Sequence, residues 1–161
     1  RHWSDEYIRE QEEVFRQQML WASEASLPVI IHVREAHDTV FRILDSLAGS
    51  GISMKGVFHA FSGSIETYRR IKTYGDFKIG IGGVITYKNA GIAATVKDIP
   101  LEDILLETDS PWLTPVPYRG KRNESAYLRA VAEKTAAVKE TDTETVDRIT
   151  TSNAKKLFNL R

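Results

Sequence analysis

Three potential metal ligands stand at the ends of short apolar runs in the chain. His32 and His59 each lie near the end of such a run, and Asp109 ends a later one. The carboxyl ends of parallel strands form the face on which barrel enzymes build their active sites. Neutral imidazole and carboxylate groups together suit zinc, manganese or similar divalent ions. The sequence therefore predicts a divalent metal site formed by His32, His59 and Asp109.

A second carboxylate precedes Asp109 in the stretch EDILLETDSPWLTP. Glu107 and Asp109 are two residues apart, so on a strand they would share one face. An unpaired buried charge is costly, which means that both carboxylates need cationic or hydrogen-bonding partners. We expect Asp109, at the strand end, to bind the metal. Glu107, one pleat deeper, is expected to support a ligand or to bind a basic neighbour in the barrel interior.

Each of these residue types also has an ordinary structural explanation. A histidine in an apolar strand is often a hydrogen-bonded core residue, and a carboxylate at a strand end often caps a helix or forms a salt bridge. Gly80, Gly82 and Gly83 fall in the expected third strand. They mark either a β-bulge or a place where substrate comes close to the backbone. The residue pattern alone leaves these alternatives open.

Two further stretches have groups that bind phosphate. Ser62 and Ser64 follow His59, and either hydroxyl can cap the next helix while neighbouring backbone N–H groups bind a phosphate oxygen. A basic loop, residues 118–124, follows Asp109. It is either a solvated charge cluster or a clamp for phosphate.

Alternating short apolar runs and helical patterns must position these groups. The expected strands are residues 29–33, 56–61, 77–83 and 104–109. The expected helices are residues 5–25, the segments marked by Val40 to Leu47, Ile65 to Ile71, 90–96 and Leu128 to Thr135, and a last helix that starts at a capping box in residues 141–144 and ends near Phe158. Each strand-plus-helix unit takes about 20 to 30 residues, as parallel βα units do.

This order predicts an α/β fold with a parallel sheet. A complete (β/α)₈ TIM barrel needs about 250 residues, so 161 residues can supply about half of one. A doubly wound sheet is the alternative, but no glycine-rich phosphate fingerprint follows the first strand. We expect residues 1–161 to form a single domain, the half-barrel, with four βα units and terminal helices.

Composition excludes several classes of protein. The chain has 22 basic residues (Lys and Arg) and 22 acidic residues (Asp and Glu), so its net charge is zero. This balance argues against binding of DNA or an anionic membrane through an extended positive surface. The absence of cysteine excludes disulfides and thiolate metal sites. No apolar run reaches the roughly 18 residues of a membrane span. We expect a cytoplasmic protein that has no membrane partner and, since the sequence starts without Met, a piece of a longer chain.

Six stretches together resemble the TatD family of metal-dependent deoxyribonucleases, within the amidohydrolase-like barrels. They are VIIHVREAHD, GVFHAFSGS, IGIGGVITYKNA, LLETDSPWLTP, RGKRNES and the closing NAKKLF. Their order along the chain makes the resemblance specific, and it covers essentially all residues. It implies a (β/α)₈ barrel that holds one or two divalent ions (Mg, Zn or Mn) and hydrolyses phosphodiester bonds in DNA.

The resemblance also implies roles for individual residues. His32 and His59 match the family's two later histidine ligands, and Asp109 matches its final aspartate, a metal ligand that orients or deprotonates the attacking water. Glu107 and Ser110 match positions with supporting roles. Contacts to substrate phosphate are expected from a further set, namely Arg34, Ser62, Arg119, Arg122 and Asn123. Ser125 stands where the family usually has Pro, and we expect this change to affect the rigidity of the loop more than the chemistry.

Two family motifs do not occur in this sequence. The first is the His-x-His strand that opens the family's barrel, and the second is the strand that carries a metal-bridging Glu. We therefore expect this chain to correspond to strands five to eight. Its partners are expected to be DNA and either the missing half of the barrel or a second copy. Two alternatives stay open: a non-catalytic half-barrel that pairs with a partner half, inactive on its own, and an amidohydrolase that acts on C–N bonds.

Overall fold

A parallel four-stranded sheet forms the centre of the molecule. The structure is a computed structural model that describes residues 5–160. The strands are β1 (Val29–His32), β2 (Met54–His59), β3 (Gly75–Ile81) and β4 (Ile104–Leu106), and each pairs in parallel with the next one along the chain. This order, β1-β2-β3-β4, is that of a barrel wall, whereas a doubly wound sheet reverses its order at a switch point. The predicted parallel α/β fold is confirmed.

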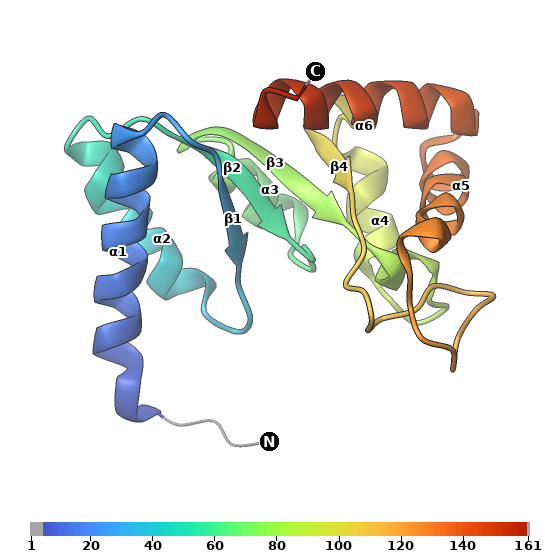
Figure 1. The fold of residues 1–161 in the computed structure, drawn as a ribbon, viewed down its shortest axis with the longest axis horizontal. Helices are drawn as coiled ribbons and strands as arrows, with labels where there is room; N and C mark the ends of the chain where they lie inside the picture. Colours follow the sequence, from blue (N-terminus) through green and yellow to red (C-terminus); the bar gives the residue numbers. More distant parts are fainter. Residues whose placement is uncertain (1–4, 161) are drawn as a thin grey trace.

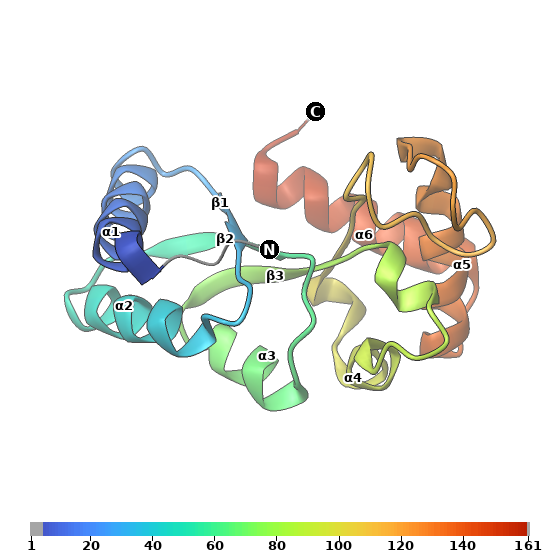
Figure 2. The ribbon, with the colours of Figure 1, turned by 90° about the horizontal axis from the view of Figure 1, so that it is seen from below.

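Helices alternate with the strands as expected, with the first helix before β1 and the last two after β4 (Figure 1). They are α1 (Ile8–Glu24), α2 (His37–Gly49), α3 (Ile65–Ile71), α4 (Ile92–Asp98), α5 (Leu128–Lys139) and α6 (Thr143–Phe158). Seen from the carboxyl ends of the strands, α2, α3 and α4 lie along one side of the sheet (Figure 2). In the described part of the chain, none of these helices has the length and apolarity needed to cross a membrane.

Some predicted boundaries were wrong. The fourth strand ends at Leu106 instead of Asp109, because its ladder to β3 stops where β3 itself ends, at Ile81. The second strand starts two residues earlier than expected and ends at His59. The capping box is also displaced by one residue: Asp142 is the N-cap of α6, and its side chain accepts a hydrogen bond from the Thr145 N–H.

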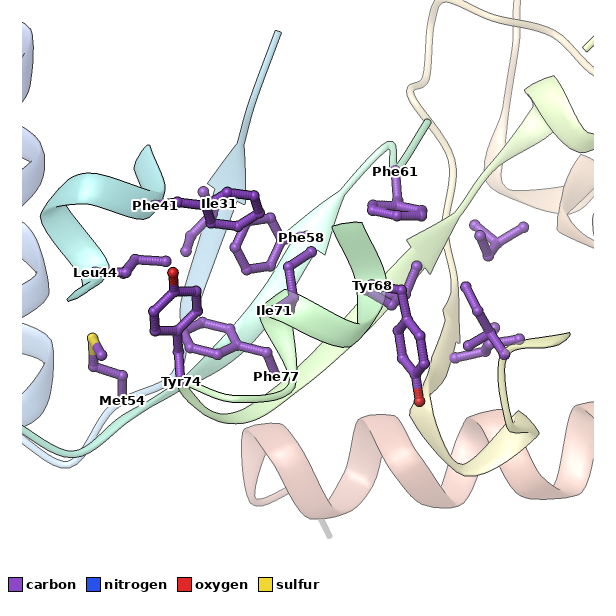
Figure 3. Packing of buried hydrophobic residues seen from close by; sticks show 14 of the residues in the cluster. Ile31, Phe41, Leu44, Met54, Phe58, Phe61, Tyr68, Ile71, Tyr74 and Phe77 are labelled. Atoms are coloured by element: carbon purple, nitrogen blue, oxygen red, sulfur yellow. The ribbon is translucent and has the colours of Figure 1, made fainter. Parts of the chain in front are cut away.

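The main hydrophobic core lies between the sheet and helices α1 to α5 (Figure 3). Phe58 of β2 and Phe77 of β3 are almost fully buried and pack edge to face, with ring centroids 5.4 Å apart. Ile71 of α3 and Leu44 of α2 close the core from the helical side. This packing holds the strands in register and so fixes where their carboxyl ends point.

The opposite face of the sheet is covered only in part. Val57 of β2 and Leu105 of β4 pack against Leu157 of α6, which lies across the start of β4 (Figure 1). Ile30 of β1, in register with Val57, is 66% exposed. In a parallel sheet that is covered on both faces this position would be buried.

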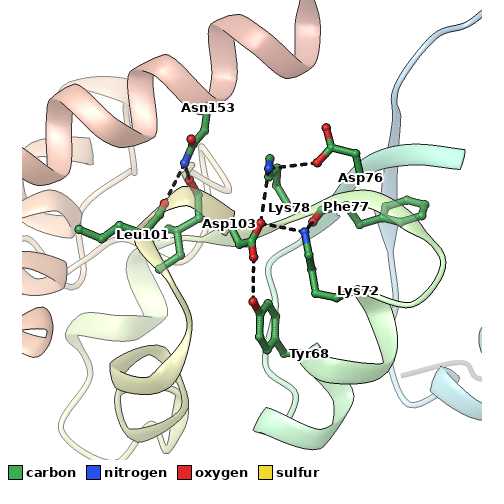
Figure 4. Close-up of polar contacts among 9 residues, drawn as sticks. Tyr68, Lys72, Asp76, Phe77, Lys78, Leu101, Asp103 and Asn153 are labelled. Carbon is green, nitrogen blue, oxygen red and sulfur yellow. Dashed lines mark hydrogen bonds and ion pairs between the residues drawn. The ribbon is translucent and has the colours of Figure 1, made fainter.

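A polar cluster ties the amino end of β4 to its neighbours (Figure 4). Asp103 accepts hydrogen bonds from the Tyr68 hydroxyl at 2.7 Å and from Lys72 Nζ at 2.8 Å, and Lys78 Nζ lies 3.4 Å from the same carboxylate. Asn153 of α6 donates to two backbone carbonyls around the start of β4, both at 2.8 Å. Burial alone would raise the pKa of Asp103, but the hydrogen bonds from Lys72 and Tyr68 outweigh it and lower that pKa.

Asp103→Asn is expected to reduce the free energy of unfolding by about 2 kcal/mol at pH 7, the scale of hydrogen bonds to charged groups. Since folding lowers the pKa of Asp103, its stabilising effect is present above the unfolded value near 4 and is lost as pH falls through the folded value. The difference between wild type and variant should therefore shrink below about pH 4. Urea unfolding at pH 7 and pH 3 measures it, with the exposed Asp98→Asn as control. Equal stability at pH 7 would contradict the prediction.

Candidate functional site

Two of the predicted ligands lie side by side at the carboxyl ends of β1 and β2. His32 and His59 are the last residues of these strands and are in register. Their ring centroids are 5.8 Å apart. His32 is exposed because β1 forms the edge of the described sheet, whereas the His59 side chain is only 23% exposed. The strand register thus brings both imidazoles to the edge on which the sequence predicts a site.

His59 lies between two carboxylates. Its Nδ1 is 2.9 Å from Glu107 Oε1, and its Nε2 is 2.7 Å from Asp109 Oδ1. The prediction that these acids share one strand face was wrong, because β4 ends before both of them. The Glu107 N–H still donates to the Ile81 carbonyl at 3.0 Å, and beyond it the chain leaves the sheet. This departure lets the two carboxylates approach opposite nitrogens of one ring.

Glu107 occupies space that a glycine provides. A Cβ built at Gly80 would overlap Glu107 Oε2. Gly80 keeps regular strand pairing with Leu105, so the interpretation as a β-bulge was wrong at this position. The group that comes close to the backbone here is the side chain of Glu107. The lack of a side chain on β3 therefore decides where this carboxylate sits.

The backbone after His59 adds a second restraint on Glu107. Ala60 has a positive φ of 49°, and its N–H donates to Glu107 Oε1. Glu35 and Leu113, in the loops after β1 and β4, also have positive φ, at 54° and 51°. Non-glycine residues in this conformation are uncommon and persist where the surroundings hold them. Three of the loops that surround the candidate site therefore contain such a residue.

Glu107 and His59 each shift the pKa of the other. Burial raises the pKa of Glu107, against the Ala60 N–H and His59, which favour the carboxylate. Burial would lower the pKa of His59, but the adjacent Glu107 and Asp109 outweigh it and raise that pKa. The carboxylates of Glu107 and Asp109 thus favour a proton or a metal cation at the His59 ring.

A cavity of about 300 Å³ opens beside this cluster. Four predicted site residues line it, and its remaining walls include apolar side chains such as Ile85 and Leu113. The four are His32, Arg34, Ser62 and Asp109. Ser64 instead caps α3, accepting a hydrogen bond from the Thr67 N–H, as expected for one of the two serines. The cavity therefore combines imidazole, carboxylate, guanidinium and hydroxyl groups.

The remaining predicted residues lie in the loop after β4, outside the lining of this cavity. Arg119 is held over the ring of Tyr87, with Cζ 4.3 Å from the centroid and Nη1 donating to the hydroxyl at 2.6 Å. Arg122 is exposed. Ser110 Oγ donates to Thr108 Oγ1 at 3.2 Å. Phosphate contacts by the two arginines stay predictions.

Asn123 holds the loop together. It is only 3% exposed, its Nδ2 donates to the Trp112 carbonyl at 2.6 Å, and its N–H donates to the Pro111 carbonyl at 3.0 Å. Its Oδ1 is buried and has no hydrogen-bond partner among residues 5–160. In this structure Asn123 is thus part of the loop framework, and its expected contact with substrate phosphate stays a prediction.

The donor set of the cluster fits a divalent ion. With the Nδ1 proton donated to Glu107, His59 presents the lone pair of Nε2, the usual arrangement for a ligating histidine. Nε2 and Asp109 Oδ1 are then two acceptors 2.7 Å apart, and such a pair needs a proton or a cation between them. In residues 5–160, however, no group of three or more His, Asp or Glu side chains is arranged to hold a metal. His32, whose ring lies 5.8 Å from that of His59, is the third potential ligand.

Sequence reasoning missed several residues that shape the site. Ala60 and Gly80 position Glu107, and Tyr87 restrains Arg119. The glycines of the third strand were the one indication available, since they suggested a close approach. No pattern in the sequence predicts a positive φ at an alanine or a contact between residues 87 and 119.

Comparison with known proteins identifies relatives along the whole chain. The family model of the TatD related DNase matches residues 1–159. An uncharacterized metal-dependent hydrolase of Bacillus subtilis, YabD, is 43% identical over 160 residues, which are 99% of this chain and 62% of that protein. The metal-dependent hydrolase YcfH of Escherichia coli is 36% identical over 153 residues, covering 93% of this chain and 56% of the relative.

Solved structures give the same relationship. The crystal structure of YJJV, a TatD homolog from Escherichia coli, superposes with a TM-score of 0.86 at 27% identity, over 99% of this chain and 61% of that one. A TatD family hydrolase from Entamoeba histolytica superposes with a TM-score of 0.81 at 20% identity, over 96% of this chain and 58% of its own length, which shows the fold alone. The fold class is thus that of the TatD TIM barrels, and the chain spans about three fifths of the length of its relatives, as with YabD at 62%. Because the family model matches residues 1–159 and YabD is 43% identical over 160 residues, the chain belongs to the TatD related DNase family of metal-dependent hydrolases.

Proposed function

We propose that the whole protein hydrolyses phosphodiester bonds in DNA with one or two divalent metal ions. The observation that carries this proposal is the placement of His59 between Glu107 and Asp109, beside a cavity lined by Arg34 and Ser62. Cationic and hydroxyl groups suit a phosphate, and the imidazole–carboxylate pair suits the metal. The family name adds nuclease activity as an expectation for this chain.

Each residue has a separate part in the proposed reaction. His32, His59 and Asp109 would hold a divalent ion, and that ion would acidify water and polarise the phosphoryl oxygen. Asp109 orients the attacking water and accepts its proton as the new P–O bond forms. Glu107 keeps the proton on His59 Nδ1 and so leaves Nε2 available for the metal. Arg34 and Ser62 hold the scissile phosphate. When the P–O bond to the departing strand breaks, its oxygen takes up the proton that Asp109 accepted and becomes a hydroxyl.

The choice between DNA and a C–N substrate is tested with two probes. A labelled single-stranded oligonucleotide and a simple amide are each incubated with the metal-loaded protein. We expect the oligonucleotide to be cut, the cleavage to stop with a chelator and to return with added Mn²⁺ or Mg²⁺, and the amide to stay intact. Cleavage of the amide alone would favour the amidohydrolase alternative and overturn the proposal.

We further propose that this chain works with more barrel structure, supplied by additional sequence or by a second copy. Within the described residues β1 pairs only with β2, and Ile30 on the partly covered face is 66% exposed. An open strand edge next to exposed apolar side chains favours association. We also propose a cytoplasmic location.

Ile30→Lys is expected to weaken this association, because a charged side chain cannot be buried against an apolar partner at low cost. Light scattering of the 161-residue chain should show dimers or larger species for the wild type and a shift to monomer for the variant. Ile8→Lys, at an exposed position on α1, is the control for added charge. Monomers for the wild type at all concentrations would contradict self-association.

A further inference from the structure

An exposed tryptophan lies next to the candidate metal ligand Asp109. Trp112 is 74% exposed, the largest value among the exposed large hydrophobic residues of the described chain. It stands three residues after Asp109, and the next residue, Leu113, lines the cavity. A single exposed apolar side chain is common on protein surfaces. What sets Trp112 apart is the way its backbone is held.

The backbone of Trp112 is fixed from both sides. Its N–H donates to the Asp109 carbonyl at 2.6 Å, and its carbonyl accepts from Asn123 Nδ2 at 2.6 Å. Asn123 is itself buried. Two hydrogen bonds therefore fix the backbone of Trp112, whose indole is exposed. One of them joins this backbone directly to Asp109, the proposed general base. Because folding already orders this loop, ligand binding does not carry the entropic cost of ordering it.

Cationic side chains extend from the same loop. Lys121 and Arg122 are exposed, and neither takes part in an ion pair within the part of the chain that the structure describes. Arg119, in contrast, is committed to Tyr87. An aromatic platform with cations available for phosphates is the composition with which proteins hold single-stranded nucleic acid. The face of a base is open to stacking only where the base is unpaired or at an end.

We propose that Trp112 stacks on an unpaired nucleobase beside the scissile phosphate, so that single strands and frayed ends bind in preference to duplex DNA. This inference rests on the proposed phosphodiesterase function and specifies the substrate of the same site. Lys121 and Arg122 bind the neighbouring phosphates and do not distinguish one base from another.

The test measures binding in the presence of a chelator, so that no strand is cut. The probes are an eight-residue oligothymidylate, an abasic strand of the same length and charge, and a blunt duplex. Trp112→Ala in the full-length protein is expected to weaken binding of the oligothymidylate about tenfold, the scale of one base–aromatic stack. Binding of the abasic strand should not change. Trp112→Phe keeps a ring and should stay within about threefold of wild type.

Fluorescence supplies an independent readout of the same contact. The oligothymidylate should quench part of the tryptophan emission of the wild type and of Trp21→Phe, a control at another exposed tryptophan, on α1. Trp112→Phe should lose that quenching. An indole that emits as a buried group and is not quenched would show that another protein segment covers Trp112, which would overturn the proposal.

The outcomes separate this inference from the function on which it rests. If the metal-loaded wild type cuts the oligonucleotide while Trp112→Ala binds it as tightly as wild type, the stacking role is wrong and the nuclease function stands. If the wild type neither binds nor cuts DNA, the proposed function itself is wrong. Equal weakening of the thymidylate and abasic strands would also overturn stacking, because the abasic strand offers no base.

Discussion

Asp109→Asn in the full-length protein is expected to lower kcat for oligonucleotide hydrolysis by about 10²–10⁴-fold, the range found for loss of a general base. The variant keeps the shape of the side chain, and its amide nitrogen can donate to His59 Nε2, which Asp109 Oδ1 faces at 2.7 Å. In the proposed mechanism, it removes the negative charge that binds the metal and the oxygen that accepts the proton of water. Geometry is thus preserved while both chemical roles are lost.

Metal analysis of Asp109→Asn distinguishes the loss of metal binding from the loss of the proton acceptor. The variant should hold less metal than wild type after dialysis, and excess metal should restore occupancy without restoring kcat. The exposed Asp98→Asn on α4 removes one carboxylate elsewhere and should behave as wild type. An Asp109→Asn enzyme with full activity would remove Asp109 from the mechanism.

Gly80→Ala is expected to weaken metal binding about 10–100-fold, the usual cost of disturbing the group that orients a metal-ligating histidine. A Cβ at this position would overlap Glu107 Oε2, so the carboxylate must move. Its movement breaks the contacts with His59 Nδ1 and with the Ala60 N–H, after which the imidazole is no longer fixed in one tautomer. The added methyl group should therefore weaken metal binding indirectly, by displacing Glu107 from His59.

A structural effect of Gly80→Ala must be measured separately, since overpacking itself costs about 1–3 kcal/mol. Gly49→Ala is the matched control, because nothing lies within 4 Å of a Cβ built there. In the double variant Gly80→Ala, Glu107→Ala the steric conflict is gone, so stability should recover in part while metal affinity stays low. Full recovery of metal affinity in the double variant would contradict a positioning role for Glu107.

The sequence predicts the sheet well because its strands are short, apolar and regularly spaced. Parallel strands packed between layers are apolar throughout, and the runs that begin at Val29 and Gly56 fit that rule. The rule fails in one respect at Ile30, which is 66% exposed because the face of β1 that carries it is not covered by the described residues. The apolar pattern of β1 indicates that Ile30 suits a buried position. Whether that position is buried depends on which other residues pack against this face of the sheet.

The detailed arrangement of the site depends on contacts between distant residues. Glu107 and Asp109 continue an alternating pattern, yet the strand stops at Leu106 because its neighbour β3 stops at Ile81. The approach of both carboxylates to His59 also needs the space at Gly80 and the positive φ of Ala60. A strand end that depends on pairing with β3 and a carboxylate position that depends on a missing side chain have no local sequence pattern. The sequence could therefore suggest candidate site residues, which stay predictions, but it could not predict their mutual contacts.

The proposed function requires a divalent metal, held by His59 and its neighbours, that drives phosphodiester hydrolysis. The most direct measurement combines metal analysis with cleavage of a labelled oligonucleotide by full-length wild type and His59→Ala, each with chelator and with metal restored. We expect the chelator to abolish cleavage by the wild type, added metal to restore it, and His59→Ala to bind little metal and to cut at a small fraction of the wild-type rate. A His59→Ala protein that retains both its metal and full activity would contradict the claim.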